Sequence, residues 1–500
     1  MKTVAENSTE LTGTNRLIPS ISCKTDDSVL RMGPQKPSDR MSDANSQAPP
    51  CNALLDHFRC PAEFIDIKFN RQPSTQATCF RFGHETCYGQ LTTEFALNHP
   101  HEKGLFNAEA NTAFQNGSLS LPFDPDDVID NLRLERYLQS NAPSHLERAL
   151  KDAYYAIRPL LPVNLRKHIQ RAYLKTRASR AFPHWPVDTT VEDLCEHLLL
   201  LSMQAQGIDE IPFIWFWPNR ARSAFAMTHD VETEKGRDFC TQLMDLDDSF
   251  GIKASFQIVP EERYALTSGF IQSIRDRGFE INLQDLNHDG NLFRDRAEFE
   301  RRARKINRHA QLFGASGFRA AVLYRNFDWL AGLNFSYDMS APNVAHLDPQ
   351  PGGCCTVMPY FVGKMLEIPV TTTQDYTLFH LLNNYSLDLW KTQINHIMSR
   401  HGLASFIVHP DYILEKRARR VYTDLLTFLR ELNRKHNIWF ALPAEINRWW
   451  RARQQMRIVN RSGAWQIEGD GSASATLAFA RRIGDRLEYE LAEPKSQNAK

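Results

Sequence analysis

The part of the chain after Pro218 alternates short apolar runs with longer amphipathic segments. Seven runs have the length and composition of buried strands: SAFAMTH (223–229), KASFQIV (253–259), FEINL (279–283), GFRAA (317–321), LEIPV (366–370), SFIVH (405–409) and IWFAL (438–442). The segments between them are mostly long enough for helices, and strands that alternate with helices build a parallel sheet. The sequence therefore predicts an α/β fold, a distorted (β/α) barrel with seven or eight parallel strands.

One of the intervening segments carries the signals of a complete helix. From about Asp295 to Phe313, apolar residues recur at helical spacing, at Phe299, Ala303, Ile306 and Ala310. Gly314 follows at the position where a glycine commonly ends a helix in the left-handed conformation. We expect this helix to pack its apolar face against the predicted sheet.

Outside the barrel, which we predict over 218–455, the pattern changes along the chain. Residues 1–50 are rich in Ser, Asn, Asp, Pro and Thr, a composition that predicts a disordered tail. Residues 51–130 contain short alternating stretches such as EFIDIKF and TCFRFG between Gly, Asn and Pro, which predict a small β-containing unit. Together with the segment that follows, this unit would form an N-terminal α/β extension of the barrel.

Residues 131–217 change to helical spacing and predict a helical connector. The first helix is indicated by Leu146, Leu150, Tyr154, Ile157 and Leu161, with Ser144 and Glu147 in a capping box. A second helix is expected from about Val191 to Met203, and core packing is the simplest role for both apolar faces. At the other end, residues 456–500 contain WQIEG and ATLAFA, which predict a short C-terminal β appendage.

Composition narrows the classes of partner. Of the 500 residues 42% are hydrophobic, which suffices for a large core, and Lys plus Arg equals Asp plus Glu at 59, which gives no reason to expect nucleic acid. The sequence shows neither the apolar run of a secretory signal nor a membrane span, which predicts a cytoplasmic protein. The nine cysteines lack C-x-x-C spacing and predict reduced thiols. The pattern leaves the oligomeric state open.

Ionisable residues gather where a parallel barrel would bring its loops together, at the carboxyl ends of the predicted strands. They are Asp230 and Glu232 after SAFAMTH, His288 after FEINL, Arg319 within GFRAA, Asp375 after LEIPV and His409 at the end of SFIVH. Because the carboxyl ends of barrel strands converge on one mouth, we expect these side chains to meet.

The spacing of Asp230 and Glu232 suits a shared chemical task. Two residues apart on an extended chain, their carboxylates point the same way, so one can hold a cation while the other takes a proton from the water bound to it. His229 should face the opposite side and is interpreted as structural. His288 lies in a polar, glycine-terminated loop and is a candidate imidazole ligand for a divalent metal.

Several motifs resemble a known family in their order along the chain. T-H-D-V-E, N-L-Q-D-L-N-H-D-G, G-F-R, P-Q-P-G-G, T-T-Q-D-Y-T-L-F and V-H-P-D-Y look like the successive motifs of the polysaccharide deacetylase (NodB-homology) family. The likeness covers less than half the chain. It implies that Asp230 is the general base, that Glu232 and His288 are metal ligands, and that Arg319 orients the base by a charge-assisted bond.

The same resemblance assigns the remaining site residues and the reaction. His409 matches the general acid of the family, and Asp375 is the carboxylate expected to raise its pKa and fix its tautomer. The implied cofactor is a divalent metal ion, Zn, Mn or Co, and the implied partner is a carbohydrate substrate. The reaction would be hydrolysis of a non-peptide amide, the N-deacetylation of an N-acetylated sugar or polysaccharide.

Two positions depart from the family pattern and keep other functions open. Gln284 stands where the family has a histidine ligand, and Glu232 stands where it has the shorter aspartate. An amide oxygen is a weaker ligand than imidazole for zinc but is acceptable to a harder ion such as manganese. The alternatives are a catalytically degenerate carbohydrate-binding or scaffold protein that keeps the barrel, and a hydrolase acting on another carbon–nitrogen bond, such as that of a small cyclic amide.

The remaining motifs are interpreted as structural. P-Q-P-G-G (349–353) predicts a turn that places a loop on the substrate side, since Pro and Gly fix such geometry. The adjacent Cys354 and Cys355 have no histidine nearby, which favours packing over nucleophilic catalysis. The sequence contains no G-x-G-x-x-G, Walker A or G-x-S-x-G motif, so it gives no support to a nucleotide-binding or serine-hydrolase function.

Overall fold

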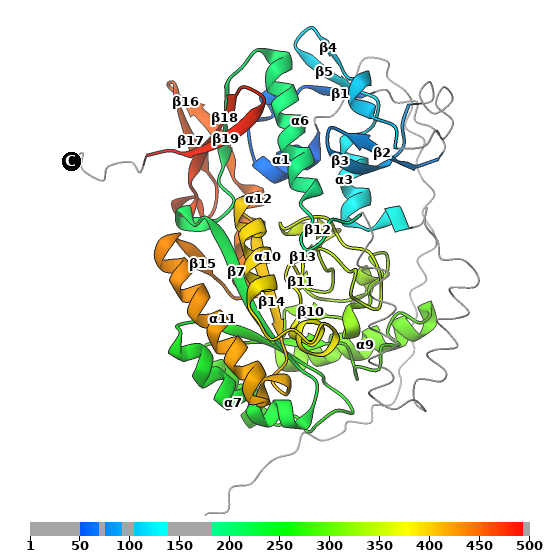
Figure 1. The fold of residues 1–500 in the computed structure, drawn as a ribbon, viewed down its shortest axis with the longest axis vertical. Helices are drawn as coiled ribbons and strands as arrows, with labels where there is room; N and C mark the ends of the chain where they lie inside the picture. The colour runs from blue at the N-terminus through cyan, green and yellow to red at the C-terminus, as the bar shows by residue number, and fades with distance from the viewer. Residues whose placement is uncertain (1–50, 70–75, 93–104, 139–181, 494–500) are drawn as a thin grey trace, which may run out of the picture.

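A computed structural model describes residues 51–69, 76–92, 105–138 and 182–493. The predicted tail over 1–50 and the first helix of the predicted connector, at 144–161, lie outside the described residues. Figure 1 places an N-terminal unit at one end of the molecule and the barrel helices α7, α9 and α11 at the other.

The largest sheet within the described residues has nine strands in the order β12-β13-β11-β10-β9-β8-β7-β14, with β15 also paired to β7. The strands are β7 (Ser223–Val231), β8 (Ala254–Ile258), β9 (Glu280–Gln284), β10 (Gly317–Arg319), β11 (Tyr337–Asp338), β12 (Tyr360–Val362), β13 (Met365–Glu367), β14 (Leu403–Val408) and β15 (Ile438–Phe440). Every pairing in this sheet is parallel except that of β12 with β13. Each of the seven predicted runs overlaps one of these strands, and the prediction of a mainly parallel α/β fold is confirmed.

The sheet curls but stays open, because no backbone ladder joins its two edges in the part of the chain that the structure describes. Side-chain hydroxyls connect the segment after β13 to β14 instead. Ser405 Oγ donates to the Pro369 carbonyl at 2.5 Å, and the Ser405 N–H donates to Thr371 Oγ1 at 2.9 Å. The Thr371 N–H in turn donates to Ser405 Oγ at 3.0 Å. Hydroxyl groups thus satisfy backbone donors and acceptors that a closed barrel would pair with each other.

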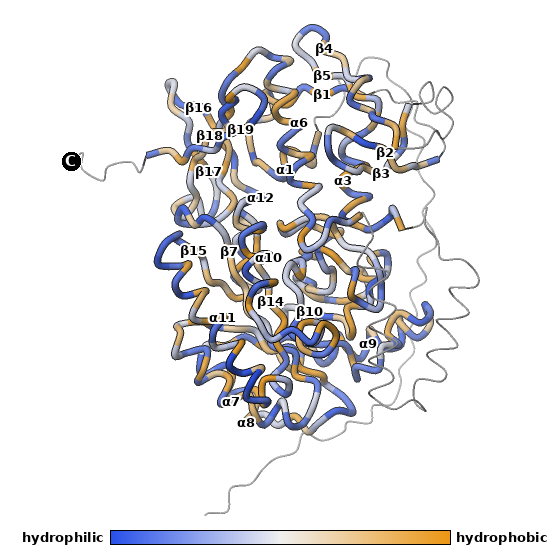
Figure 2. The backbone as a smooth tube through the Cα atoms, viewed as in Figure 1, coloured by the Kyte–Doolittle hydropathy of each residue, from blue (hydrophilic) through white to orange (hydrophobic). Residues whose placement is uncertain are grey.

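Helices cover the sheet. They are α7 (Glu234–Ser249), α8 (Ser268–Asp276), α9 (Arg296–Phe313), α10 (Asp388–Ser399), α11 (Lys416–Lys435) and α12 (Pro443–Gln455), with a π-helical turn at Tyr376–Leu381. Along α11, hydrophilic and hydrophobic segments alternate in Figure 2, and its apolar face is buried. The predicted helix α9 is confirmed: Asp295 accepts a hydrogen bond from the Glu298 N–H, and Gly314 ends the helix with a φ of 53°. Within the described residues, no helix combines the length and the apolar character that a membrane span needs.

The N-terminal unit and the C-terminal strands pack against each other beside the barrel. The elements before the barrel are α1 (Asn52–Phe58), β1 (Ile67–Phe69), β2 (Thr78–Phe82), β3 (Glu85–Gly89), β4 (Ala113–Gln115), β5 (Ser118–Leu121), α3 (Pro125–Arg133), α6 (Thr190–Gln206) and β6 (Glu210–Ile214). Those after it are β16 (Arg457–Arg461), β17 (Ala464–Glu468), β18 (Leu477–Ile483) and β19 (Arg486–Leu491). One apolar core runs through both groups and reaches the barrel base.

Strand β6 corrects the prediction of a helical connector over 131–217. The five residues of β6 are extended because they pair antiparallel with β18, which comes from more than 260 positions further along the chain. Residues 210–214 form a strand because of a partner that lies far away in the sequence. The local pattern, which follows a helical segment, therefore does not indicate a strand there. The second predicted helix is present as α6.

A buried ion pair between Arg325 and Glu135, which belongs to the N-terminal unit, holds the P-Q-P-G-G turn. Arg325 Nε donates to Glu135 Oε2 at 2.8 Å, and the Gly353 N–H donates to Glu135 Oε1 at 2.6 Å. Gly353 has a φ of 144°, and a Cβ there would lie 2.3 Å from the Asn343 carbonyl oxygen, so only glycine fits. Cys354 and Cys355 behind the turn are buried.

Candidate active site

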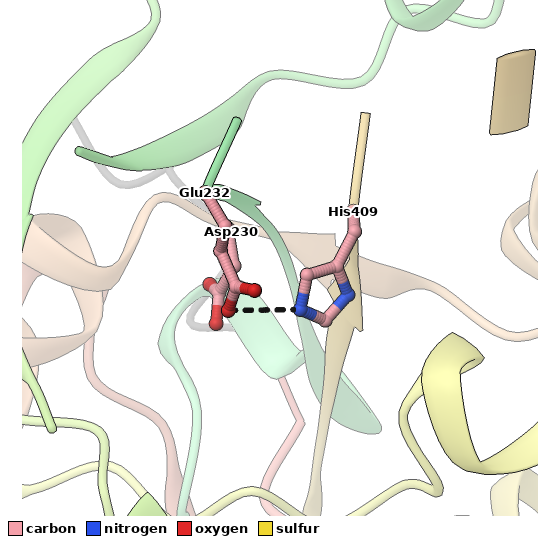
Figure 3. Close-up of side chains that lie close together, drawn as sticks. All are labelled: Asp230, Glu232 and His409. Carbon is pink, nitrogen blue, oxygen red and sulfur yellow. Dashed lines mark ion pairs between the residues drawn. The ribbon is translucent and has the colours of Figure 1, made fainter. Parts of the chain in front are cut away.

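Asp230, Glu232 and His409 converge at the carboxyl ends of β7 and β14. Figure 3 shows the two carboxylates and the imidazole directed toward one another, and their ligand atoms all lie within 4.8 Å of each other. The pleat of β7 explains the arrangement, since alternate residues face the same side of a sheet. His229, between them in sequence, points to the other side, and the expected convergence of the acids with His409 is observed.

Asp230 is buried and held by two donors. Arg319 Nη1 donates to Asp230 Oδ1 at 2.5 Å, and Gln284 Nε2 donates to Oδ2 at 3.1 Å. Arg319 is itself fixed, because it also donates to Thr228 Oγ1 at 2.8 Å and to the Met339 carbonyl at 3.1 Å. A charge-assisted bond to a rigid guanidinium fixes the orientation of the Asp230 carboxylate.

Glu232 is the centre of a cluster of nitrogen atoms. Its Oε1 lies 2.7 Å from His288 Nε2 and 3.3 Å from His409 Nε2, and it accepts a hydrogen bond from Gln284 Nε2 at 3.0 Å. Burial by itself would raise the pKa of Glu232, but the adjacent His409 and His288 hold that pKa well below its usual value. Glu232 is therefore a fixed negative charge in the middle of the site.

Asp375 contacts both the imidazole ring and the backbone of His409. Its Nδ1 lies 2.6 Å from Asp375 Oδ1, and its backbone N–H donates to Asp375 Oδ2 at 2.7 Å. Burial lowers the pKa of the imidazole, but the carboxylates of Asp375 and Glu232 raise it well above its usual value. The proton on Nδ1 faces Asp375, so Nε2 is the nitrogen that faces Glu232 and the site.

His288 lies in a loop with left-handed backbone. Its φ is 55°, and Gly290 follows with a φ of 76°, which turns the chain back after β9. Arg263 Nη2 donates to the His288 carbonyl at 2.6 Å, and Arg302 Nη2 donates to Asp289 Oδ2 at 2.8 Å. These two arginines anchor the loop, so that the imidazole is held against Glu232. Burial lowers the pKa of His288, while the Glu232 carboxylate raises it, and the net shift is upward.

The donor set fits a divalent cation. Ligands of one ion, with bonds of about 2.0–2.2 Å, lie roughly 3 Å apart, and the 2.7 Å between Glu232 Oε1 and His288 Nε2 is close to that separation. Carboxylate oxygens and imidazole nitrogens are ligands that Zn, Mn and Co share. In addition, Gln284 Oε1 is buried without a hydrogen-bond partner, and rotation of the amide would turn this acceptor toward the two carboxylates.

Gln284 and three further residues were not identified from the sequence as site residues. Gln284 Nε2 bridges Asp230 and Glu232, whereas the sequence suggested for Gln284 only the role of a weaker metal ligand in place of a histidine. Thr228 holds Arg319, and alternation along β7 could have placed it on the site face. Tyr412 packs on His409 with 4.6 Å between ring centroids, and Arg263 supports His288. The last two come from loops whose path the sequence does not fix.

The acid–base groups lie at the carboxyl ends of the strands of a curled, mainly parallel α/β sheet. Barrel enzymes place their active sites at this same position.

No family model matches the chain, and no curated protein matches it. Solved structures similar to it include a protein assigned as a polysaccharide deacetylase from Mycobacterium smegmatis, with 18% identity, a TM-score of 0.41, and coverage of 50% of this chain and 97% of that one. The Puue allantoinase is similar at 14% identity and a TM-score of 0.37, covering 47% and 92% of the two chains. The peptidoglycan deacetylase PdaC from Bacillus subtilis is similar at 9% identity and a TM-score of 0.31, covering 48% and 96%.

Proposed function

We propose that this protein hydrolyses a carbon–nitrogen amide bond outside peptides, by removing the N-acetyl group of an N-acetylated sugar or polysaccharide with the help of a divalent metal ion. The observation that carries the proposal is the meeting of a buried carboxylate fixed by arginine, Asp230, with an imidazole fixed by a second carboxylate, His409. A base and an acid held within one ligand-sized space are what hydrolysis of an amide requires.

Asp230 is the proposed general base. Arg319 holds one of its oxygens at 2.5 Å, which leaves Oδ2, now bonded to Gln284, to accept the proton of the attacking water. The water oxygen forms a bond to the acetyl carbon as its proton passes to the carboxylate. Because the Arg319 contact is maintained by Thr228 and Met339, the carboxylate needs little reorganisation during the step.

His409 is the proposed general acid. With a pKa raised by Asp375 and Glu232, the imidazole is protonated near neutral pH and has a proton to give from Nε2. That proton goes to the amine nitrogen as the carbon–nitrogen bond breaks. The products are acetate and a free amine, and the base and the acid then exchange their extra and missing protons with solvent.

Glu232 and His288 are the residues that would hold the metal, with Asp230 and His409 beside them. When bound, a divalent cation polarises the amide carbonyl and lowers the pKa of water at the site. Zn, Mn and Co are the candidate ions, and an oxygen from Gln284 in place of an imidazole favours the harder ones among them. Glu232 also keeps the imidazoles of His409 and His288 oriented toward the site.

A second candidate function has a specific observation in its favour. The Gln284 amide donates to both carboxylates, so hydrogen bonds occupy oxygens that a metal would use. A protein that keeps this arrangement permanently would bind carbohydrate without hydrolysing it. Metal content and turnover, measured together, distinguish the two functions.

The test combines metal analysis with acetate release from N-acetylglucosamine oligomers, with a small cyclic amide as a parallel substrate. Asp230→Asn and His409→Ala are each expected to lower turnover at least about 10²-fold, the usual range for a lost acid or base. The matched controls are Asp238→Asn in α7 and His396→Ala in α10, whose side chains are exposed and carry none of the proposed roles. Acetate release that is unaffected by both site variants, or a metal-free protein that binds the oligomers without acetate release, would reject the hydrolase.

A further inference from the structure

Glu135, the second residue after α3, has a backbone conformation that glycine usually supplies. Helix α3 ends at Arg133, and Glu135 turns the chain with a φ of 57°. Left-handed backbone is uncommon for other residues and is kept where the surroundings hold it. The side chain is only 4% exposed, so a charged group is buried at a turn where a small residue is the ordinary choice. The turn therefore directs a carboxylate of the N-terminal unit toward the barrel.

Glu135 and its neighbour Tyr137 hold the loop that follows β11. The Gly353 N–H donates to Glu135 Oε1 at 2.6 Å, and a Cβ at Gly352 would lie 2.7 Å from the same oxygen. Tyr137 donates to the Gly353 carbonyl at 2.7 Å. The backbone of the P-Q-P-G-G turn thus fits closely against a short segment of the N-terminal unit, and the two glycines leave room for that segment.

Arg325 connects the same carboxylate to the loop that follows β10. Its Nε donates to Glu135 Oε2 at 2.8 Å, and its Nη2 forms an ion pair with Glu135 Oε1. The guanidinium also donates to the Leu323 carbonyl at 3.0 Å and to the Pro351 carbonyl at 3.2 Å. One arginine is therefore bonded to the N-terminal unit and to both loops, through the forked geometry that a guanidinium provides.

The turn that Arg325 holds in the loop after β10 is strained. Val322 and Leu323 have φ values of 58° and 54°, and a left-handed β-branched residue is an outlier. Val322 is 38% exposed, so burial of its side chain does little to offset the strain. Strained backbone persists where contacts hold it, and it is common at functional sites. This turn begins two residues after Arg319, which orients the proposed base.

The two ends of the loop after β10 are held by different groups. Next to the sheet, the Ala320 N–H donates to Ser340 Oγ at 2.8 Å, a contact made within the barrel. This contact holds the residue beside Arg319 independently of the N-terminal unit. The outer part of the loop depends on the pair of Glu135 with Arg325. Loss of the pair should therefore move the outer parts of both loops and leave the proposed base oriented.

The charge of Glu135 is needed because Arg325 is buried. Burial lowers the pKa of Arg325, but the adjacent Glu135 and the nearby Asp348 raise it, and the net shift is upward. Asp348 itself accepts a hydrogen bond from Gln374 Nε2 at 3.1 Å. Removing the charge of Glu135 would leave the buried guanidinium to a carboxylate that is already bonded elsewhere, which is unfavourable for a buried cation.

We propose that Glu135 and Arg325 are positioning residues for substrate binding: through this buried ion pair, the N-terminal unit holds the loops after β10 and β11 in the conformation that accepts the substrate. Loops at the carboxyl ends of barrel strands form the substrate side of barrel enzymes. The inference rests on the proposed function and deepens it, since it gives the N-terminal unit a role in the activity of the barrel.

The first test measures acetate release from the N-acetylglucosamine tetramer by the full chain. Arg325→Lys keeps the charge pair with Glu135, but an ammonium group cannot also contact the two loop carbonyls. KM should rise at least about tenfold, while kcat stays within about threefold of the parent. Glu135→Gln keeps the shape and removes the charge, and it should raise KM further. A loss of stability alone would lower the amount of folded enzyme without changing KM.

Arg453 provides a matched control, because it is a second buried arginine that joins the N-terminal unit to the barrel. It donates to the His57 carbonyl at 2.8 Å and to the Ile214 carbonyl at 2.7 Å. Arg453→Lys should lower the melting temperature and leave KM within about twofold of the parent. A KM that rises in Arg453→Lys as much as in Arg325→Lys would overturn the proposal, and so would an unchanged KM in Arg325→Lys.

Amide hydrogen exchange tests the held loops without any substrate, so it separates this proposal from the hydrolase function. In Arg325→Lys and Glu135→Gln, exchange over 320–325 and 349–353 should be at least about tenfold faster than in the parent, with β7 and β14 unchanged. Such localised exchange in a protein that releases no acetate would reject the hydrolase and support the pair as a positioning device for a binding site. Acetate release with parent-like exchange in both variants would reject the positioning pair alone.

Discussion

Two buried histidines on neighbouring strands, His229 in β7 and His409 directly after β14, differ in how their second nitrogen is used. Each is paired with a buried aspartate, His229 with Asp247 at 2.9 Å and His409 with Asp375 at 2.6 Å. Both are almost fully inaccessible to solvent. Pairing with a carboxylate and burial therefore do not by themselves distinguish a structural histidine from a candidate acid.

The difference lies on the far side of each ring. The other nitrogen of His229 contacts the Val408 carbonyl at 3.1 Å, and Tyr422 donates to the same Asp247 at 2.6 Å, so the group is closed. The other nitrogen of His409 faces Glu232 across 3.3 Å, at the edge of the cluster. A histidine with both nitrogens occupied by the fold holds elements together, whereas one with a nitrogen facing a site can transfer a proton.

The largest effect is expected at Asp375. Asp375→Asn removes the carboxylate that sets the tautomer and charge of His409, and acetate release should fall about 10³- to 10⁴-fold, as for other histidines deprived of their orienting carboxylate. The melting temperature should change little, because asparagine can still accept from the His409 N–H. Turnover within tenfold of the parent would contradict the assigned pairing, and Asp238→Asn serves as the control.

The matching change on the other histidine should affect stability instead of turnover. His229→Ala leaves Asp247 buried beside Tyr422 alone, and breaking a buried pair costs about 3–5 kcal/mol. Urea unfolding should report this loss, while kcat per folded molecule stays within about threefold of the parent. A loss of turnover without a loss of stability would mean that the two histidines do not differ in the way described.

A smaller effect is expected when the ligand set is completed. Gln284→His restores a second imidazole next to Glu232 and His288, and metal affinity should rise about 10- to 100-fold. Competition with a chelator measures it independently of activity. Gln272→His, on the exposed face of α8, is the control, and an affinity that does not change in Gln284→His would place the metal elsewhere.

The smallest effect is expected at Glu192 of α6. This buried acid has hydrogen-bond partners but is not part of the candidate active site. Burial raises its pKa from 4.5 to about 8, against hydrogen bonds from Thr356 and Val357 that lower it. Because the folded protein holds this proton more tightly, its contribution to stability is complete below pH 4.5 and is lost as the pH rises through 8. Glu192→Gln should remove that loss.

Thermal unfolding between pH 5 and 9 checks the prediction for Glu192. The melting temperature of the parent should fall relative to that of Glu192→Gln over this range, by a few degrees for each kcal/mol of the difference. Parallel curves would show that Glu192 is already ionised in the folded protein. Glu192 thus extends the comparison of His229 and His409 to a buried acid whose hydrogen-bond partners are all structural.

Much of the barrel could be predicted because its signals are local. The apolar run before Asp230, the α9 stripe with Gly314 and the motif order each depend on a few adjacent residues. Strand β11 is only two residues long, and β6 depends on a partner in the C-terminal part of the chain, so neither left a periodic pattern. The role of Gln284 could not be predicted either, because a glutamine side chain can bind a metal through its oxygen or donate hydrogen bonds through its nitrogen.

The sequence alone determined which chemical groups stand at the ends of which strands, because strand periodicity and turn residues act over short distances. The tertiary structure decided which of those groups meet: Glu232 with His288, His409 with Asp375, and Glu135 with Arg325 in the loop after β10. Such pairings depend on sheet order, curvature and the docking of an outside segment. These are set by packing across the whole molecule, so no local pattern specifies them.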